Sequence, residues 1–504
     1  MVETFFDVHA HTEYSNLRLV DCINHPKDLI NRAIEIGLSG CSITDHEALC
    51  SHMIVNKYAK EIKEKYPDFT IALGNEIYLT DTRDRGQKYY HFILLAKDRL
   101  GYKGLCELSS TAWYNLYVDR RLERVPTLKS ELQEIMKKYK GHIIATTACI
   151  GGELSTNLLG LALARKAQDK EAEREYYDNA CNFINFCIEV FGKDDFYIEC
   201  APSIKEDQVI VNKQLLNVAH AFNLKMVVGT DAHYLKKEDR FVHKAFLNSK
   251  DGEREVDEFY EYSYMQSPKE VREHLSAAMS DRDIDWIFEN SLEVKEKIDF
   301  YSLEKHQHIP EVEVINYKKQ GYLKYFGGSF DGYNDQLDEF YNKYPILTEL
   351  FDSDNIQERY WVNQCFEALI DKGIGLKEEY ISRLNEEARI KKVIGEKLET
   401  CMFAYPNTLQ HYIDLFWRCG STVGAGRGSA CSGLNHYLLG VTQLDPIEWN
   451  LPFWRYLNDE RVELGDIDLD LAPSKLPKIL EEIRKERGEL GIIQVCTFGT
   501  EATK

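Results

Sequence analysis

The chain has 504 residues, of which 44% are hydrophobic and 12% aromatic, and its formal net charge is −21 at pH 7. This length suffices for two to four domains, and the apolar content excludes a largely disordered chain. The acidic balance argues against a surface that coats nucleic acid non-specifically, but it leaves room for a nucleic-acid enzyme, because carboxylate-rich metal sites draw on the same acidic residues.

Nothing in the sequence indicates a membrane or a secreted protein. No apolar run approaches the about 20 residues that a membrane helix needs. The N-terminal sequence MVETFFDVHAHT lacks the basic region, the long apolar stretch and the cleavage site of a signal peptide. The 13 cysteines are scattered and are expected to be reduced thiols. We therefore expect a cytoplasmic protein.

Residues 1–240 alternate short apolar runs of β type with amphipathic stretches. The stretches Lys27–Ile36 and Asp207–Phe222, for example, have helical spacing. Seven such runs predict an α/β fold, a parallel barrel with helices outside. The runs are Phe5–His9, Gly40–Thr44, Thr70–Glu76, His91–Ala96, His142–Ala148, Phe196–Cys200 and Lys225–Gly229.

Nine residues able to bind metal ions accompany these runs, and most lie at the C-terminal ends, where barrels of this kind carry their chemistry. His9 and His11 would share one face of a strand. Imidazoles suit zinc, manganese or iron, carboxylates can bridge two cations, and the thiolate of Cys149 favours zinc. His91 instead begins its run, and no ligand is expected from Glu199, near the end of the sixth run. The nine candidates are His9, His11, Asp21, His46, Glu76, His91, Cys149, Asp231 and His233.

A single histidine at a strand end is more often a polar residue that forms hydrogen bonds within the protein than a metal ligand. The whole set, with two pairs of the form H-x-H or D-x-H and a TDH sequence on successive runs, is hard to explain in that way. Two or three cations held by such a set can activate a water and hold a phosphate in line.

Beyond the barrel, helical patterns prevail up to residue 420, with a loop-like connection at Tyr325–Tyr333. The turn Gly424–Ser429 (GAGRGS) then offers backbone N–H groups, a guanidinium and a hydroxyl, which suit a triphosphate, although a flexible loop explains it equally well. A helix is expected near Leu476–Arg487.

An acidic motif precedes that helix. In a strand, Asp466, Asp468 and Asp470 would all face one side. Like charges this close are costly unless cations bind them, and paired carboxylates that hold two magnesium ions are what nucleotidyl transfer needs. A solvated acidic loop is the alternative.

Several segments resemble one known family. DVHAHTEYSN, CSITDHEAL, HFILLAKDRLGYKGLCELSS, IIATTACIGGEL and GTDAHYLKKEDRFVH resemble the polymerase-and-histidinol-phosphatase (PHP) domain of bacterial replicative DNA polymerases of the C family, the DNA polymerase III alpha subunit. GAGRGS, LDP, LNDERVELGDIDLDL and VCTFGTEATK occur in the order seen in the palm of the same family.

This resemblance implies a distorted seven-stranded PHP barrel, a mostly helical segment and an incomplete polymerase-β-like palm. We expect domains at residues 1–275, 276–420 and 421–504. The barrel would hold two or three zinc or manganese ions, and in relatives that retain the site it acts as a 3′–5′ exonuclease.

The resemblance also implies roles in the palm. The first two catalytic carboxylates, which would hold magnesium, are Asp468 and Asp470. The phosphates of an incoming dNTP would be contacted by Arg427, Gly428 and Ser429.

Some positions depart from the family pattern. Ala425 and Gly465 stand where the family usually has proline, which indicates a divergent member from a phage or mobile element. Glu13 is an alternative to Asp21 as a ligand, because the loop that carries them is longer than in common members. Lys504 matches a family lysine to which we assign no role.

We therefore expect the N-terminal part of a DNA polymerase III alpha subunit, a nucleotidyltransferase of DNA replication that acts on primer–template DNA and single-stranded 3′ ends. Because the chain stops before the third catalytic aspartate of the family, polymerisation is expected to need a C-terminal polymerase half or other replisome subunits. The alternatives are a stand-alone PHP phosphoesterase for small phosphomonoesters and a structural metal-bound module of a split polymerase.

Overall fold

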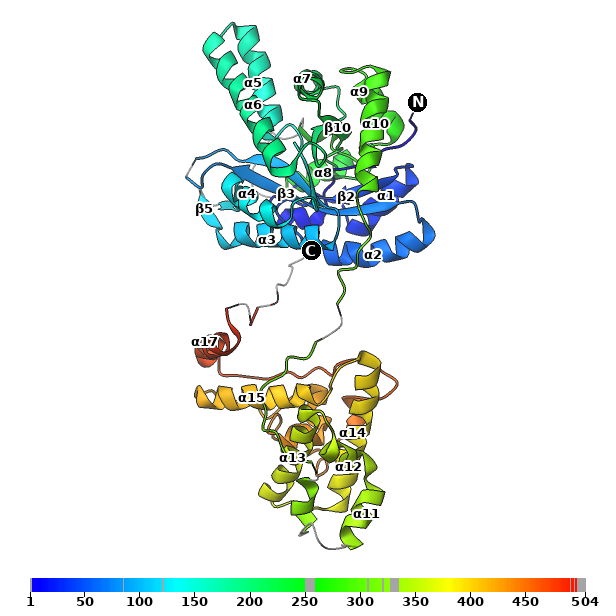
Figure 1. Cartoon of the computed structure of the whole chain (residues 1–504), viewed down its shortest axis with the longest axis vertical. Coiled ribbons are helices and arrows are strands. Elements are labelled where there is room, and N and C mark those ends of the chain that lie inside the picture. The colour runs from blue at the N-terminus through cyan, green and yellow to red at the C-terminus, as the bar shows by residue number, and fades with distance from the viewer. Residues whose placement is uncertain are drawn as a thin grey trace. The chain divides into compact units, whose positions relative to one another are not determined.

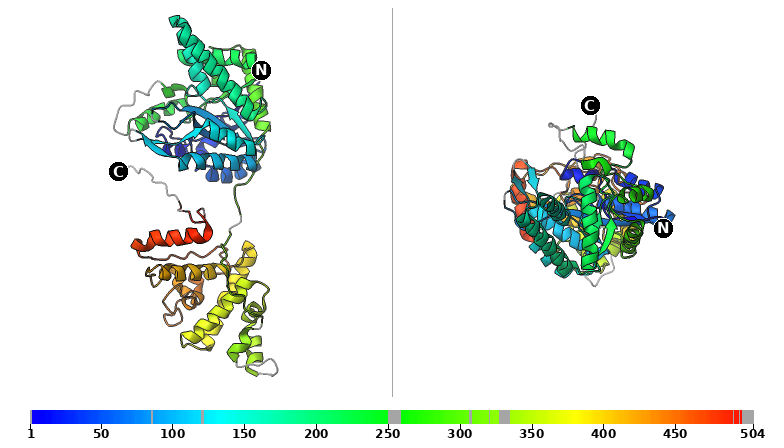
Figure 2. Two further views of the ribbon diagram at one scale, coloured as in Figure 1. Left: turned by 60° about the vertical axis from the view of Figure 1, so that its left-hand side comes forward. Right: turned by 90° about the horizontal axis from the view of Figure 1, so that it is seen from above.

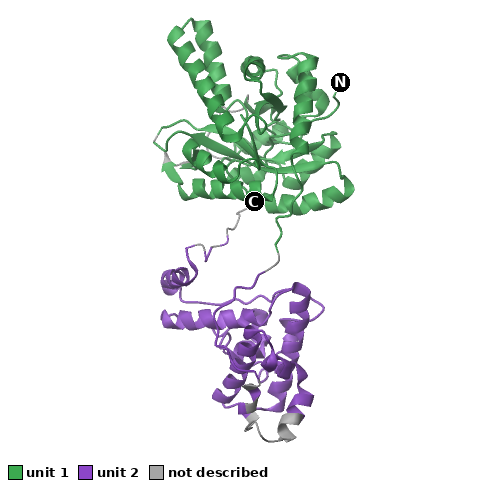
Figure 3. Cartoon of the chain, in the orientation of Figure 1, with its two compact units in different colours: residues 1–305 green, residues 306–504 purple. Residues whose placement is uncertain are grey.

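The computed structural model consists of two compact units, residues 1–305 and 306–504 (Figure 3). No helix among the described residues is long and apolar enough to cross a membrane, and the described cysteines form no disulfide. The three domain limits expected from the sequence stay a prediction. The structure describes residues 2–84, 86–119, 122–249, 259–305, 308–319, 321–326, 335–489, 491–493 and 495.

Unit 1 is built around a sheet that closes on itself (Figure 1). The strand order is β1-β2-β3-β4-β8-β9-β10, and the chain after β1 returns to β10, where the Val8 N–H donates to the Val228 carbonyl (3.2 Å). All seven apolar runs form strands of this barrel. They are β1 Phe6–Asp7, β2 Gly40–Ile43, β3 Thr70–Thr80, β4 Tyr90–Ala96, β8 Ile143–Thr146, β9 Phe196–Cys200 and β10 Lys225–Val228.

One strand of the barrel runs against the others. β4 pairs antiparallel with β3, where Tyr78 lies opposite His91, and with β8, where Ile93 lies opposite Thr146. The prediction of a wholly parallel barrel is therefore wrong for β4. The reason is the connection, residues 81–89, which is shorter than the about 10–12 residues that a parallel crossover needs. The reversal brings His91, at the start of its strand, to the edge where the other strands end.

Helices cover the outside of the barrel, because both faces of its strands are apolar and must be buried. The two helices named from the sequence are observed as α1 (Pro26–Glu35) and α7 (Glu206–Phe222). α5 (Glu153–Ala167) and α6 (Lys170–Phe191) lie side by side as a long pair (Figure 1 and Figure 2). The others are α2 His52–Lys65, α3 Arg99–Tyr114, α4 Lys129–Lys138, α8 Arg240–Leu247, α9 Pro268–Leu275 and α10 Asp281–Glu296.

Three short strands lie beside the barrel. β7 (Pro126–Leu128) pairs in parallel with the end of β3, and β5 (Tyr117–Asp119) pairs antiparallel with β6 (Leu122–Arg124).

Unit 2 is helical around its own apolar core, in which Phe351, Trp361 and Phe366 are fully buried. The expected C-terminal helix is α17, and the Tyr325–Tyr333 connection lies mostly outside the described residues. The helices are α11 Asp335–Lys343, α12 Pro345–Asp352, α13 Ile356–Asp371, α14 Glu378–Leu398, α15 Ala404–Arg418, α16 Leu434–Leu438 and α17 Leu476–Arg487.

The acidic motif does not form the strand expected from the sequence. Its pairing is limited to an isolated bridge between Val423 and Leu471 and a hydrogen bond from the Gly424 N–H to the Asp470 carbonyl (2.9 Å). No strand with which it could form a ladder exists among the described residues of unit 2.

Candidate metal centre

The nine candidate ligands converge at the barrel edge where the parallel strands end. All are buried except His91, which is partly exposed. They come from six strands (β1, β2, β3, β4, β8 and β10) or the loops that follow them, so atoms far apart in the sequence meet at one place. Three groups have ligand atoms within 4.8 Å of one another: His11 with His46 and His233, His9 with His11 and Asp231, and Glu76 with His91 and Cys149.

The first two histidines and one carboxylate form the tightest group. The Nε2 atoms of His9 and His11 are 3.0 Å apart, and Oδ1 of Asp231 lies 3.3 Å and 3.1 Å from them. Ligand atoms around a tetrahedral ion lie about 3.3 Å apart, given metal–ligand distances of about 2.0–2.2 Å. The spacing of these three atoms therefore fits ligands of one cation.

Glu76 connects the groups. Its Oε1 lies 2.9 Å from Nδ1 of His91 and 3.3 Å from Nε2 of His9, and its Oε2 contacts Nδ1 of His46. His91 Nδ1 lies 3.6 Å from Sγ of Cys149. A carboxylate placed between imidazoles in this way can bridge two cations.

Asp21, and not Glu13, belongs to the cluster. Asp21 is fully buried, and its Oδ2 lies 3.2 Å from Nε2 of His46 and 3.6 Å from Nε2 of His233. The Tyr260 hydroxyl donates to the same oxygen (2.9 Å). The Glu13 side chain is 41% exposed and forms its ion pair elsewhere.

Several atoms of the cluster fit a bound ion better than they fit the protein alone. Asp21 Oδ1 and His233 Nε2 are buried and have no hydrogen-bond partner among the described residues. Leaving such a group unsatisfied costs about 1–3 kcal/mol. The donor set of imidazoles, carboxylates and a thiol is the one that divalent transition-metal ions prefer.

The charges in the cluster hold two of its carboxylates in the ionised form that binds cations. The anionic groups around them raise, against burial, the pKa of His9, His46 and His233, so that a bound cation must displace protons from these rings. Burial favours the neutral acid, but His9 and His233 outweigh it and hold the pKa of Asp231 well below its usual range. His46 and His233 do the same for the pKa of Asp21, again against burial. Burial, together with the neighbouring imidazoles, lowers the pKa of His11 to about 3. Ionised carboxylates and a neutral imidazole are the states in which these groups bind metal.

Glu199 supports the cluster, although the sequence assigned it no role. Its Oε1 lies 2.6 Å from Nδ1 of His9, and its Oε2 accepts a hydrogen bond from the Thr146 hydroxyl. A carboxylate behind a histidine fixes the orientation of the ring, and with it the nitrogen that faces a metal. The signal that could have found Glu199 is its place at the end of a strand, like that of the ligands.

A second buried carboxylate, Asp45, holds the loop after β1. It accepts hydrogen bonds from the Thr12 N–H (2.6 Å) and from the hydroxyls of Ser15 (2.9 Å) and Ser51 (2.6 Å). The Ser15 hydroxyl also lies 3.1 Å from Nδ1 of His11. Asp45 thereby positions His11 through one intervening side chain.

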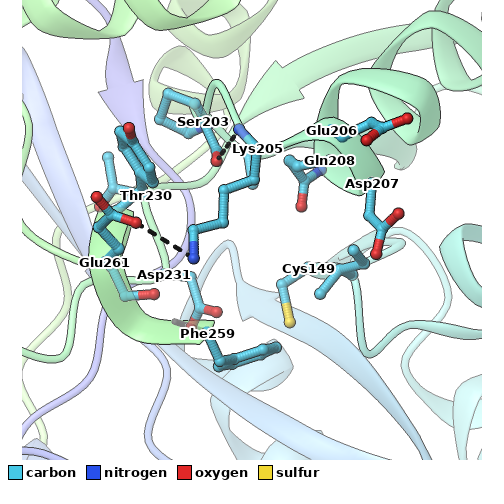
Figure 4. Close-up of a pocket in the computed structure, with 15 residues that line it drawn as sticks. Cys149, Ser203, Lys205, Glu206, Asp207, Gln208, Thr230, Asp231, Phe259 and Glu261 are labelled. Carbon is cyan, nitrogen blue, oxygen red and sulfur yellow. Dashed lines mark hydrogen bonds and ion pairs between the residues drawn. The ribbon is translucent and has the colours of Figure 1, made fainter. Parts of the chain in front are cut away.

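A cavity of about 630 Å³ opens beside two of the candidate ligands, Cys149 and Asp231 (Figure 4). Lys205 and Phe259 line it as well. A phosphate ester would have room here next to the cluster.

The palm candidates in unit 2 also lie near one another. Arg427 Nη2 is 3.3 Å from Oδ1 of Asp468, and Arg427 Nε is 3.8 Å from Oδ1 of Asp470. Gly428, with φ 64°, and Ser429 follow in the same turn. The structure thus brings the glycine-rich turn and the acidic motif together. Lys504 lies outside the described residues.

Two family models match the chain. The PHP domain matches residues 7–203, and a model described as the bacterial DNA polymerase III alpha NTPase domain matches residues 348–504.

Curated relatives match nearly the whole chain. It is 38% identical over 517 residues to "Probable DNA polymerase YorL" of Bacillus subtilis and equally to "DNA-directed DNA polymerase" of Bacillus phage SPbeta, with 98% of this chain and 38% of each relative covered. It is 27% identical to DNA polymerase III subunit alpha of Borreliella burgdorferi, again over 98% of this chain and 38% of the relative. The chain thus spans about two fifths of the length of these relatives. A PHP barrel followed by a polymerase III alpha segment is what the chain shares with bacterial and phage DNA polymerases of the C family.

Proposed function

We propose that the barrel is a metal-dependent 3′–5′ exonuclease that acts on single-stranded 3′ ends of primer–template DNA, within a protein of DNA replication. The observation that carries the proposal is the convergence of nine side chains able to bind metal, eight of them buried, some with atoms that have no hydrogen-bond partner among the described residues. The polymerase names of the relatives support DNA as the substrate.

The site would hold two or three cations, and zinc or manganese suits its donors. His9, His11 and Asp231 would hold one ion, and Glu76, His91 and Cys149 another. The remaining ligands, His46, His233 and Asp21, would complete the site. When bound, the ions supply an activated water and neutralise the charge of the phosphate.

The residues of the chain prepare this site before any substrate arrives. Glu199 holds His9 with Nε2 facing the cluster, and Asp45 holds His11 through Ser15. Burial keeps bulk water from most of the cluster, which is open to water at the cavity beside Cys149 and at the partly exposed His91. Fixed ligands and a dry surrounding are what a metal-assisted hydrolysis requires of the protein.

The test is a nuclease assay with 5′-labelled single-stranded and mismatched primer–template DNA. We expect stepwise shortening from the 3′ end in Mn²⁺ or Zn²⁺, no shortening with a chelator, and recovery when metal is returned. A preference for small phosphomonoesters would indicate the phosphoesterase alternative. Bound metal without hydrolysis of either substrate would indicate the structural module.

We further propose that unit 2 carries the first part of a polymerase site. Asp468 and Asp470 would hold magnesium, and Arg427, Gly428 and Ser429 would bind the phosphates of a dNTP. The half-exposed ion pairs of Arg427 with both aspartates support this, because they place a phosphate-binding cation beside the carboxylates. DNA synthesis would belong to a whole protein as long as the relatives.

This second proposal predicts that dNTP binding to the chain depends on Mg²⁺ and on the acidic motif. In calorimetric titrations, Asp468→Asn combined with Asp470→Asn should lose the part of the affinity that Mg²⁺ adds, because two carboxylate ligands are removed. Asp459→Asn, an exposed aspartate that pairs with Arg389, is the control. Unchanged Mg²⁺-dependent binding in the double variant would refute the assignment.

A further inference from the structure

The cavity beside the metal centre has the size of a ligand site. Its about 630 Å³ falls within the range of about 300–1,000 Å³ typical of pockets for small molecules. Figure 4 shows Lys205 reaching across it toward Glu261, the carboxylate of Asp231 in the centre, and the Phe259 ring along the lower edge. A cation and an aromatic ring therefore lie on the open side of the candidate metal ligands.

Lys205 can exchange its partner. Its Nζ lies 3.2 Å from Oε2 of Glu261, and the two side chains are 30% and 50% exposed, so that water weakens their attraction. The Lys205 N–H donates to the Ser203 hydroxyl (3.1 Å), which fixes the start of α7. Among the described residues, Lys205 is the only cationic side chain that lines the cavity, whose other charged residues are acidic. A phosphate entering here would depend on Lys205 and on bound cations.

Phe259 is held in place while its ring stays open to the cavity. The ring is 47% exposed, whereas the adjacent Tyr260 is 5% exposed. The Tyr260 hydroxyl donates to Asp21, and its carbonyl accepts a hydrogen bond from the Tyr234 hydroxyl (2.9 Å). These bonds tie the short 3-10 helix that begins at Phe259 to the candidate metal ligands. Exposed aromatic rings at fixed positions are what single-stranded nucleic acids stack on.

We propose that this cavity is the subsite for the 3′-terminal nucleotide of single-stranded DNA. Lys205 leaves Glu261 and binds a phosphate oxygen of the substrate, and Phe259 stacks on the terminal base. The inference rests on the proposed exonuclease function and deepens it, because it gives the reason why the site would select a nucleic-acid end over a small phosphomonoester.

The test compares two substrates, a trithymidylate and the same molecule with an abasic 3′ residue. The unmodified chain should have a KM about tenfold lower for the substrate with the base, since loss of one base–aromatic stack weakens binding by about this factor or more. Phe259→Ala should raise the KM of the intact substrate to that of the abasic one, with kcat little changed, and Phe259→Tyr should keep the preference. Phe241→Ala, an 80% exposed ring outside the cavity, is the matched control.

Lys205 is tested with both substrates and with inorganic phosphate as a competitive inhibitor. Lys205→Met should raise both KM values and weaken inhibition by phosphate, while Lys205→Arg should restore most of the affinity. Lys213→Met, an exposed lysine further along α7, is the control. Trinucleotides with phosphorothioate linkages, which resist hydrolysis, should bind in the same order in competition experiments.

Two results would overturn the subsite: an intact preference for the base in Phe259→Ala, or unchanged KM values and phosphate inhibition in Lys205→Met. Failure of the proposed function looks different, because the unmodified chain would then hydrolyse neither substrate in any metal.

Discussion

Replacement of His9 by alanine, or of Asp231 by alanine or asparagine, is expected to reduce hydrolysis of single-stranded DNA by about a thousandfold or more. Three ligand atoms here lie 3.0–3.3 Å apart; each alanine removes one of them, and asparagine replaces the charged oxygen of Asp231 by a neutral, weaker ligand. The remaining two would hold the cation too weakly and in the wrong geometry to activate water. The measurement is the initial rate of 3′ shortening in saturating Mn²⁺, together with the metal content of the purified variants.

The asparagine variant separates a lost ligand from a damaged fold. Asp231 has φ 49°, in the left-handed region that asparagine tolerates better than alanine. His220→Ala, an exposed histidine on α7 that stacks on Trp286, is the control for His9→Ala and should keep full activity. Full hydrolysis by His9→Ala or Asp231→Asn would remove the basis for placing the reaction in this cluster.

Glu199→Gln is expected to reduce metal affinity or activity by about 10- to 100-fold, the usual effect of losing a group that orients a metal ligand. The amide keeps the shape of the side chain but not its charge, so it holds the His9 ring less firmly. Metal titrations of the variant, followed by activity, should show a higher metal requirement.

A matched control for this variant is Glu293→Gln, which removes a carboxylate of the same barrel that pairs with Lys225 and Tyr197. It should change neither metal affinity nor rate. If Glu199→Gln needs no more metal than the unmodified chain and hydrolyses DNA as fast, the carboxylate has no part in orienting His9.

The strands of the barrel could be located from the sequence, because strands buried on both faces read as continuous apolar runs. The direction of β4 could not be read from its own residues, since an apolar run carries no direction. The signal was in its neighbourhood: residues 81–89 are too few for a helical crossover. Because β4 is antiparallel, it starts at the barrel edge where the other strands end. His91, near the start of β4, therefore lies beside the other candidate ligands.

The choice between Asp21 and Glu13 could not be made from spacing, because both acids lie in one loop. It depends on a local turn in which Oδ1 of Asn16 accepts the N–H groups of Asp21 (2.9 Å) and Cys22 (3.0 Å). It also depends on Tyr260, which comes from a distant part of the sequence. Glu199 lies at a strand end like the ligands, but that place alone does not reveal that its carboxylate contacts His9.

In the acidic motif of unit 2, the alternation of exposed and partly buried side chains could be predicted from the sequence, but whether the motif pairs with another strand could not. Asp468 and Asp470 are exposed while Ile467 and Leu469 pack partly against the core, as alternation requires. A strand also needs a neighbour along its length, and no pattern within the acidic motif reports whether one is present.

The reversed strand has a consequence for how this protein can change. Because β4 runs against its neighbours, residues 81–89 and the β5–β6 pair both lie on the edge that carries the ligands. Arg18, in the loop after β1, donates to the Glu123 carbonyl of β6 (2.8 Å). Both segments lie outside the ladder of the barrel. Insertions and deletions there would alter access to the candidate metal ligands at little cost to the fold, so we expect proteins with this barrel to differ in substrate choice at this rim.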